Sequence, residues 1–134
     1  MRMLNNILGS ILAFVGINAA IGGFLLILDP TGSKIGLTPE ILLKSPFSTF
    51  FIPGIILCAI NGVGSLAASV LAFRKNKHTG FAGAAFGSIL CGWILVQMLW
   101  IDFFWIQPAF LLIGCIEIAL SLAIIRIIRQ QKNV

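Results

Sequence analysis

Glu117 is the residue of this sequence best placed to do chemistry. It is the only charged residue in LLIGCIEIALSLAII, residues 111–125, where every other side chain suits an apolar environment. At the centre of a bilayer an ionisable side chain costs roughly 2.5–3.5 kcal/mol, so such a residue is a functional hypothesis by default. We expect its carboxyl group to be protonated at rest, because the charged form would lose its water.

Polar residues on other apolar stretches are the expected partners of Glu117. At 1.5 Å per residue, Glu117 lies roughly 13 Å from the inner end of its stretch, and Asn18 and Asn61 lie roughly 18 Å from theirs. Gln97 lies nearer the outer end of the third stretch. We therefore expect the Glu117 carboxyl to donate a hydrogen bond to Asn18 or Asn61 in one central layer.

One face of the fourth stretch is small and polar. Gly114, Glu117 and Ser121 lie at i, i+3 and i+7, so they share a face that should point into a helix bundle. Ser121 can also hydrogen-bond locally. The candidate substrate- or ion-binding residues are Glu117, Asn18, Asn61, Gln97 and Ser121.

This polar layer has two interpretations. In the first, its hydrogen bonds hold helices in register, at only ~0.6–2 kcal/mol each, and a glutamine would serve as well as Glu117. In the second, Glu117 is a proton or cation site that titrates during transport. The stretches offer no basic partner and no second acid at this depth, so both interpretations stay open.

Composition predicts an integral membrane protein. The 134 residues are 59% hydrophobic and 10% charged, against about 25% charged residues in soluble domains. Mean hydropathy is +1.08. The apolar residues form blocks of about 20, the length that crosses a ~30 Å hydrocarbon core. We predict an all-α four-helix bundle, a single transmembrane domain over residues 1–134, with spans at about 7–28, 51–73, 80–101 and 108–128.

Basic residues predict the orientation of the spans. A cleaved signal peptide is disfavoured, because the first apolar block exceeds the usual ~7–15 residues and lacks an AxA-type site. Lys34 and Lys44 are the only basic residues between the spans on the outer side, against seven on the inner side. This positive-inside bias predicts that both termini lie in the cytoplasm. The inner residues are Arg2, Arg74, Lys75, Lys77, Arg126, Arg129 and Lys132.

The outer connections carry their own signals. In residues 29–50, Thr38 can cap a short helix with Pro39 first and Glu40 in its first turn. This helix should lie on the outer membrane surface or fold over the outer end of the bundle. The third connection, IDFFWIQP, is typical of an interfacial aromatic belt. Its members are Trp100, Phe103, Phe104 and Trp105.

The stretches LLILDPTGSKIG, LLKSPFSTFFIPGIIL and WIQP together resemble a group of small four-span bacterial membrane proteins. In that group, a proline- and glycine-containing loop precedes an SPF…FxIPG start of the second helix. The resemblance covers most of the chain and implies a fold but no catalytic residue. Because that group is bacterial, we expect the membrane to be a bacterial inner membrane.

Small residues predict where helices meet. Gly83 and Gly87 form a GxxxG spacing in the third span, and Gly64 and Ala68 lie four residues apart in the second. Such faces allow close helix packing in lipid. We expect them to be used within the chain, with a homo-oligomer or a larger membrane-protein partner as the alternative.

Residues for metal, cofactor or nucleophilic chemistry do not form a motif. The three cysteines make no CxxC pair, and His78 is the only histidine. We therefore expect no enzyme, no metal and no cofactor. The net charge of +5 is explained by orientation and predicts no nucleic-acid partner.

Two functions remain. The first is a non-enzymatic accessory or structural subunit of a membrane complex or of the envelope. The alternative is a homo-oligomeric transporter or channel that uses Glu117 as a proton or cation site. In size and helix number the chain is similar to small multidrug transporters. It departs from them because their acid lies in the first helix, where this chain has Asn18, and because it has no tyrosine.

Overall fold

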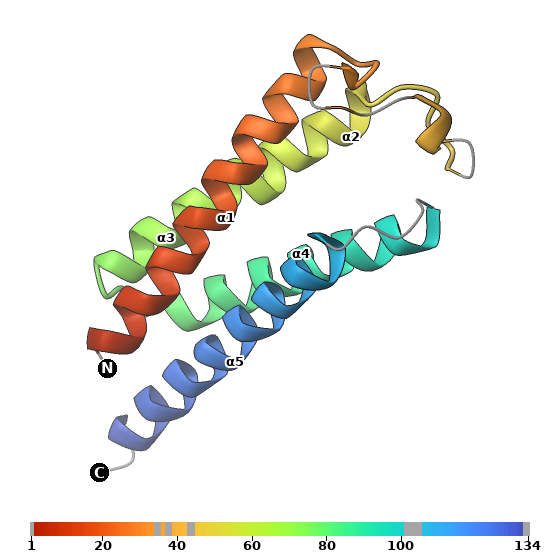
Figure 1. Cartoon of the computed structure of the whole chain (residues 1–134). Coiled ribbons are helices and arrows are strands. Elements are labelled where there is room, and N and C mark those ends of the chain that lie inside the picture. Colours follow the sequence, from red (N-terminus) through yellow and green to blue (C-terminus); the bar gives the residue numbers. More distant parts are fainter. Residues whose placement is uncertain (1, 34–35, 37–38, 43–44, 101–105, 133–134) are drawn as a thin grey trace.

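The computed structural model describes residues 2–33, 36, 39–42, 45–100 and 106–132, and in these ranges it contains helices and no strand. Four long helical segments, each long and apolar enough to cross a membrane, follow one another along the chain (Figure 1). They are α1 (Arg2–Leu28), the combined segment α2 (Phe51–Ile56), η3 (Leu57–Gly64) and α3 (Ser65–Phe73), then α4 (Thr79–Trp100) and α5 (Ile106–Lys132). The predicted all-α class with four long apolar helices is confirmed.

The second segment differs from a regular α-helix. Its middle part, η3, is a π-helix of eight residues. Each π-helical turn holds more residues than an α-helical turn, so the side chains after it are rotated about the helix axis. The sequence predicts one continuous helix over residues 51–73, and the π-helical part is a difference from that prediction. This part contains Gly62 and Gly64, and glycine is unfavourable in the interior of an α-helix, so a regular α-helix is less stable here.

The helices pack in two antiparallel pairs. One pair joins α1 to the α2–η3–α3 segment, and the other joins α4 to α5 (Figure 1). Contacts of α1 with α5 and of α3 with α4 hold the pairs together. Both termini and the α3–α4 turn lie at one end of the molecule, here called the basic end. The described residues between 29 and 50 lie at the opposite end, here called the far end.

A tight turn joins α3 to α4 at the basic end. Lys75 has a left-handed φ of 54°. Its N–H bonds the Ala72 carbonyl at 3.0 Å, and the Asn76 N–H bonds the Leu71 carbonyl at 3.0 Å. These two bonds satisfy the last carbonyls of α3 in a Schellman arrangement. The turn therefore reverses the chain within a few residues and keeps its basic side chains at one end.

The loop at the far end folds back over the helices. It contains the short 3-10 helix η2 (Pro39–Leu42), with Glu40 in its first turn as predicted. Leu42 packs in a buried cluster with Leu26 and Phe50. This packing supports the expectation that the short helix folds over the outer end of the bundle. Thr38 and residues 103–105 of the predicted aromatic belt lie outside the described residues.

Many large apolar side chains lie on the outer surface of the bundle. Large apolar side chains such as Phe14, Ile17 and Phe24 of α1 point outward. The interior mixes apolar clusters with polar groups, because the helices bury small and polar faces against one another. The buried polar residues are Asn5, Asn61, Ser65, Ser69, Thr79, Gln107, Glu117 and Ser121.

Candidate functional site

Glu117 lies in the interior of the helix bundle, on the predicted face of α5. Its residue exposure is 0%, and that of Ser121 is also 0%. Gly114 and Ile124, on the same face, are buried as well. The prediction that Gly114, Glu117 and Ser121 point into the bundle is confirmed. Their i, i+3, i+7 spacing was sufficient because α5 is a regular helix.

A column of glycines on α4 encloses Glu117. A Cβ placed on Gly87 would lie 3.1 Å from the Cβ of Glu117 and 2.9 Å from Cγ1 of Ile118. A Cβ on Gly83 would collide with the Ser121 hydroxyl. The intrachain use of these glycines is thereby confirmed. Close approach of α4 leaves the Glu117 side chain enclosed between backbones.

The Glu117 carboxyl has no hydrogen-bond partner in the described part of the chain. Both of its oxygens are buried and unpaired. Ser121 donates its hydroxyl to the backbone carbonyl of Glu117 at 2.6 Å, so this hydroxyl bonds locally, as expected, and not to the carboxyl. The predicted hydrogen bond from Glu117 to Asn18 or Asn61 is therefore wrong.

Asn61 lies in the π-helical part of the second segment and is also enclosed. Its exposure is 1%, and both its amide oxygen and its amide nitrogen are buried without a partner. The predicted interior position of Asn61 is thus confirmed, but its predicted bond to the carboxyl is not formed. A buried amide without a partner is costly, typically by about 1–3 kcal/mol.

Contact between Asn61 and Glu117 does not form the predicted central layer. Asn61 lies in the segment that packs on α1, whereas Glu117 lies on α5, which packs mainly on α4. The amide of Asn61 and the carboxyl of Glu117 make no hydrogen bond to each other.

Asn18 is outside this layer. Its side chain is exposed, and its amide nitrogen donates to the Phe14 carbonyl of its own helix at 2.7 Å. The expectation that Asn18 faces Glu117 is wrong, because depth along a helix does not fix direction. Asn18 is two residues beyond Gly16, or about 200° around the helix, and Gly16 contacts the second segment.

Gln97 is half-buried, about ten residues beyond Gly87 on α4, which corresponds to roughly 15 Å. It lies above the central layer, as predicted. Gln107 of α5 is buried at 4% exposure and was missed, because it lies just before a proline at a helix start. These two glutamines are separate from the Glu117 level.

Asn5 is a second buried polar residue that the sequence analysis missed. Its exposure is 4%, and its Oδ1 atom is unpaired. Asn5 shares a face of α1 with Gly9 and Gly16. A Cβ added to Gly9 would lie against Ala72 of the second segment, and one added to Gly16 would lie against Leu66. The spacing of Asn5 from these glycines is the signal that could have placed it inside.

Within the described ranges, no group of three or more His, Cys, Asp or Glu side chains could hold a metal ion. The three cysteines are free thiols. Cys91 contacts α5, where its Sγ lies 3.9 Å from the Leu111 carbonyl oxygen. The chemistry that the enclosed Glu117 carboxyl offers is thus binding of a proton or a cation.

Comparison of the chain with protein-family models, with curated proteins and with solved structures found no match.

Proposed function

We propose that this chain is a small, non-enzymatic multi-pass membrane protein in which Glu117 reversibly binds a proton or a small cation during transport. The observation that supports this proposal is the state of the carboxyl group: it is fully enclosed, yet neither oxygen has a partner in the described chain. A glutamate kept only to hold helices in register should make the hydrogen bonds that justify its burial.

Asn61 supports the same proposal. Its enclosed amide supplies an acceptor and two donors, and neither end of this amide is used. It also lies on a π-helical segment, a feature that is frequent at functional sites. Transport would use two or more copies of the chain, because four helices are too few to enclose a sizeable path.

The four long helices would cross the bacterial inner membrane with both termini in the cytoplasm. Seven of the nine basic residues lie in the parts of the sequence that form the basic end. Loops rich in lysine and arginine are found on the cytoplasmic side of membrane proteins. A labelling experiment tests this orientation. Lys77→Cys and Ser48→Cys would be made in a chain whose native cysteines are serine, and an impermeant maleimide added to intact cells should label only Ser48→Cys.

A flux measurement tests the transport role. Purified chain in vesicles is placed under an imposed membrane potential, with protons, Na⁺ or K⁺ as the mobile cation and with an internal dye that is sensitive to that cation. Wild type should exceed empty vesicles, and Glu117→Gln should return to their level. Asn18→Leu, a substitution on the outward face, should keep the flux. Flux that survives in Glu117→Gln would rule out the carboxyl as the binding group.

An accessory role is the second candidate, and one surface favours it. Ala85, Ser88 and Gly92 follow one outward face of α4, and a Cβ on Gly92 would meet no atom within 4 Å. A partner helix could approach closely there. The native mass of gently extracted protein separates the candidates, because an accessory subunit co-purifies with a different chain in fixed ratio whereas a transporter is a homo-oligomer.

A further inference from the structure

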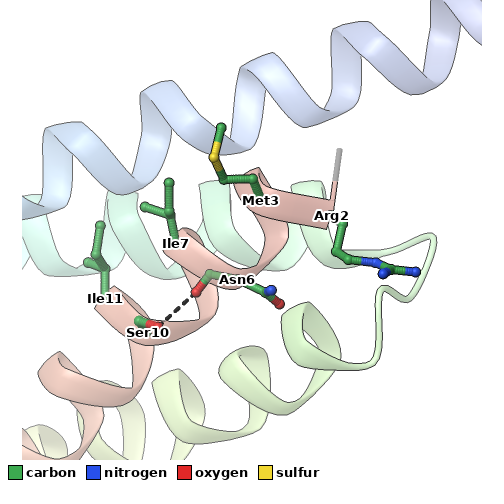
Figure 2. A pocket seen from close by; sticks show the side chains of 6 residues that line it. All are labelled: Arg2, Met3, Asn6, Ile7, Ser10 and Ile11. Atoms are coloured by element: carbon green, nitrogen blue, oxygen red, sulfur yellow. Dashed lines mark hydrogen bonds between the residues drawn. The ribbon is translucent and has the colours of Figure 1, made fainter.

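A shallow groove runs along α1 at the basic end of the molecule. Its volume is about 610 Å³, and all of its lining side chains come from the first three turns of this one helix (Figure 2). The lining residues are Arg2, Met3, Asn6, Ile7, Ser10 and Ile11.

Two parallel columns of side chains form this groove. Met3, Ile7 and Ile11 repeat every four residues, and so do Arg2, Asn6 and Ser10, so each set follows one line along the helix. Figure 2 shows the apolar set pointing to one side of α1, whereas Arg2 and Asn6 point to the other. The groove therefore presents an apolar strip beside a polar strip that ends in a positive charge.

The charge at this end has no acidic counterpart. Residues 2–11, 73–80 and 121–132 contain no aspartate or glutamate, while they carry seven lysines and arginines. The Arg2 guanidinium lies at the outermost turn of the groove, and the described residues of this end carry no acidic side chain that could pair with it. A ligand that complements the groove has an anionic head and an apolar tail.

We propose that this groove binds one anionic glycerophospholipid, with its phosphate at Arg2 and an acyl chain along Met3, Ile7 and Ile11. The proposal rests on the membrane insertion proposed above, but not on transport by Glu117. Clustered basic residues at a membrane surface attract anionic lipids. Asn6 lies one turn deeper than Arg2, where its amide can donate to the glycerol ester region.

Retention of lipid by the purified chain tests the proposal. The chain is reconstituted in vesicles of mixed phosphatidylglycerol and phosphatidylcholine, extracted gently, and examined by native mass spectrometry. Wild type should keep one phosphatidylglycerol in preference to phosphatidylcholine. Arg2→Gln should lower this preference about ten-fold, because it removes the charge-assisted hydrogen bonds from the guanidinium to the lipid phosphate. Asn6→Leu should lower it without changing the charge.

Lys132→Gln is the matched control, because it removes one positive charge at the same end but outside the groove. It should leave the lipid preference unchanged. Equal losses in Arg2→Gln and Lys132→Gln would contradict lipid binding in the groove and would indicate general charge attraction. No loss in either variant would contradict lipid binding in the groove as well. A chain that does not enter vesicles at all contradicts the proposed membrane insertion instead. Both substituted residues are exposed, and unchanged helical content by circular dichroism verifies folding.

Discussion

Gly87 of α4 lies directly against Glu117 of α5, so that a Cβ on this glycine would be 3.1 Å from the Cβ of Glu117 and 3.1 Å from the Gly114 carbonyl oxygen. A glycine lets a neighbouring backbone approach without supplying a polar side chain. In a helix interior that backbone already uses its own N–H and C=O groups. This contact therefore encloses the carboxyl without giving it a partner.

Gly87→Leu should separate α4 from α5 and destabilise the protein. The added side chain has no room between the two backbones, and overpacking of this kind typically costs about 1–3 kcal/mol. The free energy of unfolding, measured by sodium dodecyl sulfate titration in mixed micelles, should fall by that amount. Gly92→Leu on the outward face is the matched control and should lose no stability, because a Cβ on Gly92 would meet no atom within 4 Å. Equal effects of the two variants would contradict the packing.

The sequence was sufficient to predict the four helices, because long apolar blocks with polar or proline-containing ends leave little choice. The boundaries of the second segment, Phe51–Phe73, were predicted as they are observed. The first and fourth helices extend further than predicted, from Arg2 and to Lys132, because helical hydrogen bonding continues beyond the apolar core of each block. The π-helical part was not predicted, because hydrophobicity does not distinguish π from α turns.

The candidate site was predicted in part, and the errors share one cause. The face of Glu117 followed from the neighbouring Gly114 and Ser121 on one regular helix. Asn18 was placed by depth alone, although direction around the helix is set by the nearby Gly16. The absence of a hydrogen bond between Glu117 and Asn61 depends on how two helix pairs pack, and no single-helix pattern contains that information.

Glu117→Leu should stabilise the protein while it removes the proposed binding group. Leucine is close in size, and an unpaired buried polar group typically costs about 1–3 kcal/mol. The detergent titration should therefore show a gain of that size. Leu12→Ala, at a fully buried apolar position, serves as the reference for a damaged core and should lose about 2–5 kcal/mol. A loss in Glu117→Leu comparable to that of Leu12→Ala would show that the carboxyl is structural.

Two adjacent glycines of α1 should respond to alanine with opposite signs. A Cβ on Gly23 would lie 2.5 Å from the Cys58 backbone nitrogen and 2.6 Å from the Gly54 carbonyl oxygen, so Gly23→Ala should push the second segment away. A Cβ on Gly22 would meet only Cδ2 of Leu57, at 3.9 Å. Gly22→Ala should therefore gain the helix propensity of alanine, about 0.5–1 kcal/mol. Thermal unfolding followed by circular dichroism checks both signs, and stabilisation by Gly23→Ala would contradict the close contact.

A lipid-soluble and a water-soluble carbodiimide should modify different acidic residues among those described, with Glu117 open only to the lipid-soluble reagent. Its carboxyl lies among apolar helices, so a lipid-soluble carbodiimide should reach and modify it, whereas a charged, water-soluble one should not. Asp29 and Glu40 lie at the far end, and Glu40 is exposed, so they should react with the water-soluble reagent and serve as internal controls. Peptide mass spectrometry locates the adducts, and Glu117→Gln should remove the one from the lipid-soluble reagent. If the water-soluble reagent modifies Glu117 as fast as Glu40, then water reaches the central layer, and the carboxyl is not enclosed as the packing of Gly87 requires.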